Sequence, residues 1–209
     1  PLVPMGDHLL FGEYGAALNL GGFANVSIGN PLLKDGVLHA FDICPANYVL
    51  NTLAREMGKE YDEGGKIALV GSINQWVLKE LNSLPFFSQK PPKSLGAEWA
   101  EAKVFEKIDY LLPSDALATY CEHMAVQISA VLIGKKVLVT GGGAWNDYLL
   151  KRIEEYGVEL DRPEKEIVNF KEAIIFALLT YLRLTGKDNV LGATTGSGKN
   201  HSSGKVFWP

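Results

Sequence analysis

Apolar and polar residues alternate in the first part of the chain in the way that is typical of short strands. Residues 15–28 predict a hairpin, because β-type residues flank a central glycine pair on both sides. Residues 36–41 predict another strand, which we expect Asp42 to end before Pro45 breaks the chain. The apolar run at residues 137–140 predicts a further strand.

Apolar residues at helical spacing predict helices in the rest of the chain. The predicted helices follow Pro45 as far as Gly58 and then cover residues 67–81, 114–132 (capped by Ser114 or Asp115), 146–156 and 170–184. The last of them is apolar nearly all round, which is typical of a buried helix. Stretches rich in Gly, Pro and Ser predict loops at residues 85–96 and 192–204. This mixture of a hairpin, helices and a strand–turn–helix unit predicts an α/β fold.

The composition is that of an ordinary globular protein and narrows the range of functions. The 209 residues carry a net charge of −4 without a basic stripe, so we expect no nucleic-acid partner. No apolar run reaches the length of a membrane span, and the first residues lack the pattern of a signal peptide. Two cysteines, Cys44 and Cys121, favour a reduced intracellular protein. Because the first residue is not Met, we expect the chain to start within a longer protein or after processing.

Two glycine-centred turns provide the main candidate chemistry. Gly21-Gly22 lies between two strands, and Gly141-Gly142-Gly143 lies between a strand and a helix. Glycine lets the backbone approach a phosphate or an adenine closely, and a helix N-terminus favours anions. Two such turns suggest a nucleotide held between two domains. Taken alone, the triple glycine is equally well explained as a turn without a ligand, because it lacks the G-x-G-x-x-G spacing of dinucleotide-binding folds.

A third glycine-rich stretch, residues 196–200, resembles a phosphate loop only superficially. Ala193 stands where that motif needs its first glycine, and Asn200 stands where it needs a Ser or Thr to reach the metal. We therefore expect a surface loop there.

Asp42 and Glu172 are the candidate carboxylates. Asp42 lies at the end of a predicted strand, where a carboxylate can act as a general base, although a turn or cap residue is the alternative. Glu172 lies early in an apolar helix and either points at a substrate or interacts with the helix dipole. The four histidines are scattered, so we expect no metal site built by the chain. Lys93 and Lys199 lie near these sites, and solvated lysine is the default interpretation for both.

Seven segments together resemble the anhydro-N-acetylmuramic acid kinase family. They occur in the order of the family and comprise residues 1–4 (PLVP), 18–25 (LNLGGFAN), 41–42 (FD) with 45–47 (PAN), 92–96 (PKSLG), 141–146 (GGGAWN), 171–173 (KEA) and 194–196 (TTG). The resemblance implies an actin/hexokinase-like (ribonuclease H-like) two-lobed ATPase fold. It also implies that ATP and Mg²⁺ are used to hydrolyse the 1,6-anhydro bridge of this amino sugar and to phosphorylate O6, a step of cell-wall recycling in the bacterial cytoplasm.

The resemblance also implies roles for individual residues. Asp42 corresponds to the catalytic aspartate, and the sugar pocket contains Asn47 and Glu172. The second phosphate loop, at residues 18–25, and the adenosine loop, at residues 140–146, supply the cofactor-binding residues Gly21, Gly22, Asn25, Gly141, Gly142, Gly143 and Asn146. Phosphoryl transfer needs mostly positioning and charge stabilisation, which the backbone N–H groups of such loops provide in part.

The chain departs from the family pattern in two places. Asp42-Ile43-Cys44-Pro45 replaces the common Asp-Thr-Gly-Pro, and the first phosphate loop of the family, Gly-Thr-Ser-x-Asp-Gly, is missing. We therefore expect residues 1–60 to be the remainder of an incomplete first lobe and residues 61–209 to form the second lobe, in a fragment or short member of the family. A non-catalytic nucleotide- or sugar-binding module is the alternative, and a Rossmann-like enzyme is disfavoured. A homodimer is a further option that the sequence leaves open.

Overall fold

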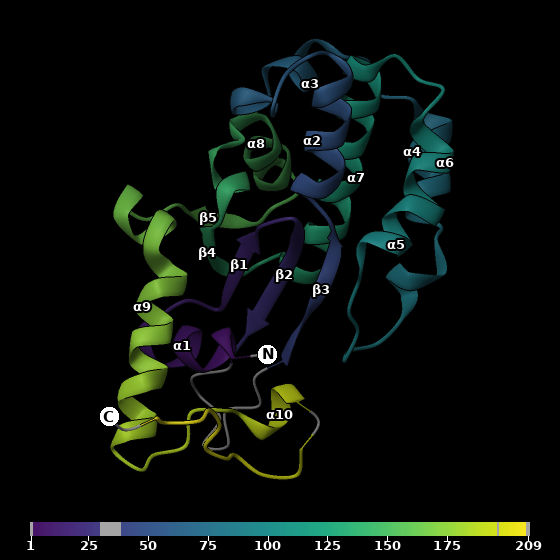
Figure 1. Cartoon of the computed structure of the whole chain (residues 1–209). Coiled ribbons are helices and arrows are strands. Elements are labelled where there is room, and N and C mark those ends of the chain that lie inside the picture. The colour runs from purple at the N-terminus through teal and green to yellow at the C-terminus, as the bar shows by residue number, and fades with distance from the viewer. Residues whose placement is uncertain (1, 30–38, 196, 208–209) are drawn as a thin grey trace.

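A five-stranded sheet forms the centre of the computed structural model, which describes residues 2–29, 39–195 and 197–207 (Figure 1). The strands are β1 (Ala16–Leu20), β2 (Phe23–Ile28), β3 (His39–Pro45), β4 (Lys136–Thr140) and β5 (Glu159–Asp161), in the spatial order β3-β2-β1-β4-β5. The first three strands are antiparallel, whereas β4 runs parallel to β1 and β5 parallel to β4. The prediction of an α/β fold is confirmed.

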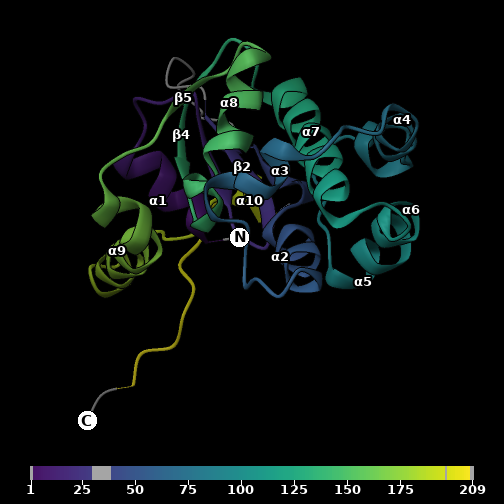
Figure 2. The ribbon, with the colours of Figure 1, turned by 90° about the horizontal axis from the view of Figure 1, so that it is seen from above.

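Helices cover both faces of this sheet. They are α1 (Val3–Leu10), α2 (Asn47–Glu56), α3 (Lys66–Val70), α4 (Gln75–Asn82), α5 (Ala97–Ala100), α6 (Glu106–Ile108), α7 (Pro113–Leu132), α8 (Asp147–Glu155), α9 (Lys165–Leu184) and α10 (Gly192–Thr195), with single turns at η1 (Glu63–Gly65), η2 (Pro85–Ser88), η3 (Glu101–Phe105) and η4 (Gly142–Trp145). Figure 2 shows α1 and α9 on one side of the sheet and α2 and α7 on the other, with α4 to α6 beyond α7. Among the described residues, no helix is both long and apolar enough to cross a membrane.

Two apolar clusters hold these layers together. The larger one joins the sheet to α2, α7 and α8 and includes Leu18, Met124 and Val139, all fully buried. The smaller one lies between α1 and α9 and consists of Met5, Ile175, Leu179 and Leu182. The sheet takes strands from both sides of residue 60, so the expected boundary there does not fall between two sheets. The division into two lobes stays a prediction.

Residues 67–81 form two helices rather than the one that we expected. The chain breaks between α3 and α4 because Gly71 lies against α7, where a Cβ would come within 2.1 Å of the carbonyl oxygen of Ser114. Asn74 then begins α4 by accepting the backbone N–H groups of Trp76 and Val77. The apolar spacing in the sequence continues through the break, because the break is caused by the contact of Gly71 with α7 and not by the local sequence.

Other elements also differ from the predictions. Strand β3 continues past Asp42 to Pro45, because β2 pairs with it along this length; residues 36–38 lie outside the described residues. Helix α7 begins at Pro113, and the carboxylate of Asp115 accepts the N–H of Ser72 instead of capping that helix. The stretch 192–204 also contains the short helix α10, where only a loop was expected.

Helix α9 is not buried all round. One face packs on α1 and β4, while Phe170, Ile174 and Tyr181 are 42–59% exposed on another. The helix is longer than predicted, since it begins at Lys165. The apolar residues of α9 therefore form two surfaces: one is covered by α1 and β4, and the other is exposed.

Candidate functional site

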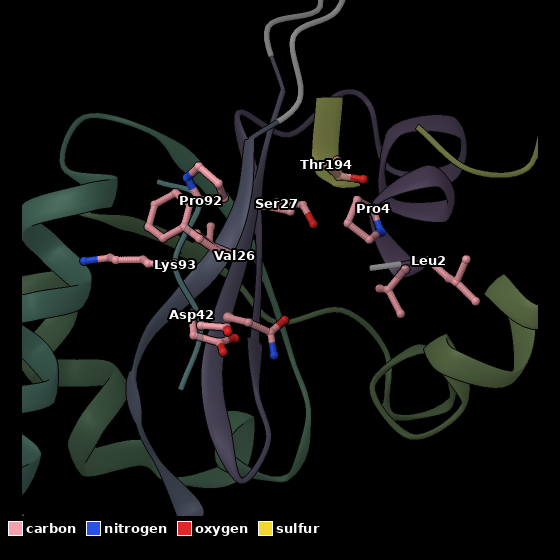
Figure 3. Close-up of a pocket in the computed structure, with 13 residues that line it drawn as sticks. Leu2, Pro4, Val26, Ser27, Asp42, Pro92, Lys93 and Thr194 are labelled. Atoms are coloured by element: carbon pink, nitrogen blue, oxygen red, sulfur yellow. The ribbon is translucent and has the colours of Figure 1, made fainter. Parts of the chain in front are cut away.

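The first candidate site is a cavity of about 530 Å³ on one face of β2 and β3 (Figure 3). We call it the Asp42 cavity. Its wall includes Ser27, Asp42 and Lys93, and the opposite side is formed by Leu2, Pro4 and Thr194. Strands β2 and β3 thus present Ser27 and Asp42, the loop before α5 presents Lys93, and the N-terminal segment and α10 close the cavity from the other side.

An irregularity in the β2–β3 pairing brings Asp42 opposite Asn25. The register shifts between Ala24 and Asn25, so that Ala24 faces Cys44 while Asn25 faces Asp42 and Ile43 is the extra residue. A β-bulge of this kind re-aims side chains and is common beside active sites. Both Asp42 and Asn25 line the cavity.

Backbone groups hold Asp42 from both ends. The N–H of Leu95 donates to Oδ2 of Asp42 over 2.8 Å, and the N–H of Asp42 donates to the carbonyl of Lys93 over 3.1 Å. Partial burial raises the pKa of Asp42, and the Leu95 hydrogen bond opposes that rise. A carboxylate with a raised pKa accepts a proton more readily near neutral pH, as a general base requires.

A second cavity, of about 660 Å³, lies at the triple glycine, and we call it the glycine cavity. Its wall contains Asn19, Thr140, Gly141, Gly142, Lys171 and Glu172. Val3 and Asn25 line both cavities, so the two are neighbours.

A row of paired polar residues joins the two cavities across four strands. Asp42 faces Asn25, Asn25 faces Asn19, and Asn19 faces Thr140 in the registers of the sheet. Directly opposed residues lie on the same face of a sheet. Three strand spacings separate the ends of this polar row, about 14 Å. A bound molecule at Asp42 and another at Thr140 would therefore lie side by side along one surface.

Each of the three glycines in the second turn is required, or tolerated, for a different local reason. Gly141 has φ +84°, and a Cβ on it would come within 2.6 Å of Oδ1 of Asn19. A Cβ on Gly143 would come within 2.7 Å of Cβ of Leu20, so this glycine lets the turn pack on β1. Gly142 lines the cavity, and a Cβ on it would make only an ordinary contact of 3.5 Å with Asn47.

Gly21, Gly22 and Asn47 lie beside the cavities, not in the walls that the described residues form. The carbonyl of Gly21 accepts the N–H of Asn47, and the carbonyl of Gly22 accepts those of Ala46 and Tyr48. The side chain of Asn47 donates to the carbonyl of Leu20 over 3.0 Å. These contacts fix the β1–β2 hairpin to the start of α2.

Of the two remaining predicted site residues, Asn146 caps a helix and Glu172 lines the glycine cavity. Asn146 is buried and begins α8, because its Oδ1 accepts the N–H of Leu149 over 3.0 Å. Glu172, which the resemblance implies for the sugar pocket, lines the glycine cavity together with Gly141 and Gly142. The structure thus brings Asn25, Gly141, Gly142 and Glu172 together and leaves Asn146 as a helix cap.

A buried ion pair beside these cavities was not predicted from the sequence. Nζ of Lys171 lies 2.7 Å from Oδ1 of Asp7, and the two side chains are only 7% and 6% exposed. Ser27, in the wall of the Asp42 cavity, donates to Oδ2 of Asp7 over 2.7 Å, and Lys171 lies 3.4 Å from Oγ1 of Thr140. A charged residue within the apolar pattern of α9 was the only sequence signal for this group.

The polar atoms of the glycine cavity suit a nucleotide with Mg²⁺. Its wall offers the carboxylate of Glu172 and the side-chain oxygens of Asn19, Asn25 and Thr140. Mg²⁺ prefers oxygen ligands and commonly uses one or two carboxylates together with phosphates. Across residues 2–29, 39–195 and 197–207, no group of three His, Cys, Asp or Glu side chains could hold a metal by itself.

The fold defines the class of protein first. The solved structures that resemble the chain include an activator of the 2-hydroxyisocaproyl-CoA dehydratase from Clostridium difficile with bound ADPNP and component A of the (R)-2-hydroxyglutaryl-CoA dehydratase of Acidaminococcus fermentans. Their TM-scores are 0.53 and 0.52 at 17% and 18% identity, over 88% and 85% of this chain and 67% and 65% of theirs. The chain shares the actin/hexokinase-like α/β fold of these proteins.

The sequence then identifies the family. The sequence model of the anhydro-N-acetylmuramic acid kinase family matches residues 1–209, and the chain belongs to this family. Anhydro-N-acetylmuramic acid kinases of Pseudomonas syringae pv. tomato and Haemophilus influenzae are 34% and 32% identical over 99% of the chain. The chain spans 61% of the length of each of these relatives.

Proposed function

We propose that the chain supplies the sugar site and one side of the nucleotide site of an ATP-dependent anhydro-N-acetylmuramic acid kinase. In this reaction water opens the 1,6-anhydro bridge, and the freed O6 is phosphorylated. The observation that carries the proposal is the polar row, which joins the carboxylate of Asp42 to the glycine cavity on a single face of the sheet.

Asp42 acts as the general base in this proposal. The Leu95 N–H and the β2–β3 bulge hold its carboxylate in the cavity wall, and burial raises its pKa. The carboxylate takes the proton of the water that attacks the anomeric carbon, and Asn25 lies directly opposite to orient a ligand group.

The glycine cavity receives the phosphates in this proposal. When bound, ATP supplies the phosphoryl group, and Mg²⁺ neutralises charge that develops during its transfer. Gly142 leaves space for close approach of the backbone, and Lys171, paired with Asp7, lines the same wall. Glu172 is the carboxylate among the side-chain oxygens that this wall offers to Mg²⁺, so we assign it to the nucleotide end of the site.

The Asn variant of Asp42 tests the catalytic role. The experiment uses a protein that contains this chain and has the full length of the related kinases. Asp42→Asn keeps the shape of the side chain but cannot accept a proton, so we expect turnover to fall by about 10²–10⁴. Calorimetric ATP binding serves as the control and should stay within error, and a cooperative melt shows that the variant is folded. Near-normal turnover would show that Asp42 has only a structural role.

The same experiment separates the enzyme from a binding module of the same fold. A non-catalytic module would bind the sugar and ATP in the unchanged protein without forming the 6-phosphate. We further propose a cytoplasmic location, where ATP is available, and no nucleic-acid partner. A homodimer, which the exposed apolar face of α9 would suit, is tested by light scattering.

A further inference from the structure

Lys93 lies in a partly buried site, whereas the sequence suggested a solvated lysine. Its Nζ donates to the carbonyl of Phe86 over 3.2 Å and lies 4.5 Å from the centre of the Phe86 ring. The ring of Phe41 is 5.9 Å away on β3. Partial burial lowers the pKa of Lys93. In Figure 3 the side chain extends away from Leu2, Pro4 and Thr194, so its ammonium does not point into the Asp42 cavity.

None of the ion pairs in the described part of the chain includes Lys93. A carbonyl and an aromatic face bind the ammonium instead, and such cation–π contacts gain strength when water is partly excluded. Phe86 itself belongs to an aromatic cluster with Phe87 and Trp99. The socket that receives Lys93 is therefore a packed part of the structure.

The main chain of the same segment holds Asp42. The carbonyl of Lys93 accepts the N–H of Asp42, and two residues later the N–H of Leu95 donates to the Asp42 carboxylate. The neighbouring residues Lys90, Pro91, Pro92 and Ser94 are exposed and offer little packing. The side chain of Lys93 thus anchors the segment that carries both hydrogen bonds, together with the half-buried Leu95.

We propose that Lys93 is a positioning residue: by fixing its ammonium in the Phe86 socket, it holds residues 93–95 so that the Leu95 N–H orients the carboxylate of Asp42. Lys93 does not touch the substrate in this proposal. Only its catalytic consequence rests on the proposed function, because the orientation of Asp42 is a property of the free chain.

The proposal predicts a specific change when the anchor is removed. Without it the Leu95 hydrogen bond loosens, and the ionised form of Asp42 loses a stabilising donor, so its pKa should rise. Among the described residues, Cys44 on β3 and Lys93 itself are titratable groups near Asp42, and the carboxylate of Glu98 lies against Gly96 beside Leu95. Burial raises the pKa of the Cys44 thiol, so the thiol stays protonated through the acidic range of the titration.

Nuclear magnetic resonance of the free chain tests the proposal without sugar or ATP. The Leu95 amide shift should follow the ionisation of Asp42 in the unchanged chain, because this amide donates to the carboxylate. In Lys93→Met the titration amplitude should collapse, and the Asp42 carboxyl midpoint should rise by on the order of one pH unit. Lys93→Arg, which keeps the cation, should restore most of the response.

Lys90→Met is the matched control, because Lys90 is exposed three residues earlier in the same segment. It should leave both readouts unchanged. A folded Lys93→Met chain with the original Leu95 amplitude and Asp42 midpoint would overturn the proposal. If Lys93→Met does not fold, the same spectra of Lys93→Gln decide, with a lost Leu95 response supporting the proposal and an unchanged response refuting it.

Discussion

The buried ion pair between Asp7 and Lys171 allows a strong prediction about stability. Lys171→Met keeps the length and apolar stem of the side chain but removes the ammonium, and Asp7→Asn keeps the shape but removes the charge. Each change leaves the other member of a 2.7 Å pair without its partner at a site where both side chains are at most 7% exposed. The pair connects α1 to α9, and its loss also affects Ser27 on β2 and Thr140 on β4.

The depth of the pair sets the expected magnitude. Removing one member of a buried pair costs about 3–5 kcal/mol, whereas exposed pairs contribute about 0–1 kcal/mol. For a protein of this size, 1 kcal/mol lowers the melting temperature by about 2–4 °C, so each variant should melt about 6–20 °C lower. The double variant Asp7→Asn/Lys171→Met should cost less than the sum of the single variants, by about 0.5–3 kcal/mol.

Urea unfolding and thermal melts of the four proteins provide the assay. Lys151→Met is the matched control, since Lys151 is 71% exposed and makes a weak, solvent-exposed ion pair with Glu155 at 3.9 Å. It should change the free energy of unfolding by less than about 1 kcal/mol. If Asp7→Asn and Lys171→Met are as mild as this control, or if their effects simply add, then the pair does not join α1 to α9 as argued.

The remaining predictions concern the site. Gly142→Val should weaken Mg-ATP binding in a folded protein, as measured by calorimetry. Gly143→Val should instead lower the melting temperature, because its side chain would collide with Leu20. Unchanged ATP affinity in Gly142→Val would show that the glycine cavity is not the nucleotide site. Burial raises the pKa of Asp42 above 3.8, so the folded chain binds this proton more tightly than the unfolded chain. The unchanged chain should therefore lose stability relative to Asp42→Asn as the pH rises from below 3.8 to neutral. A constant difference in denaturant titrations at several pH values would contradict this. The 209-residue chain alone should not phosphorylate the anhydro sugar appreciably, since the first phosphate loop of the family is absent from it and misplacement of about 1 Å can cost about 10²-fold in rate; turnover within about tenfold of a full-length relative in a coupled assay would refute this.

Local sequence signals were sufficient for the parts of the fold that depend on neighbouring residues. The β1–β2 hairpin, the helix after Pro45 and the strand before the triple glycine are all present. Asp42 and Gly142 lie in cavity walls, and their roles stay predictions. The hairpin, the helix and the strand follow from turn residues or from periodicity, which act over short stretches of chain, whereas Asp42 lies within β3 and not at the strand end that we expected.

Contacts between distant segments could not be predicted in this way. Gly71 interrupts a helical pattern because of Ser114, and Asp7 pairs with Lys171 on a helix near the other end of the chain. Asn19 and Thr140 join the site only because the registers of β1 with β2 and β4 align them with Asn25. The isolated polar residues within the apolar strands were the available signal for this row.

Mapping of both ligands onto the free chain by amide NMR tests the central claim most directly. A non-hydrolysable ATP analogue with Mg²⁺ should shift the amides of Asn19, Thr140 and Gly142, which line the glycine cavity. The anhydro sugar should shift those of Ser27 and Asp42, and Asn25 should respond to both ligands because it lines both cavities. Shifts from either ligand that avoid the polar row would contradict the account, as would saturating ligand that leaves Asn25 and Asp42 unchanged.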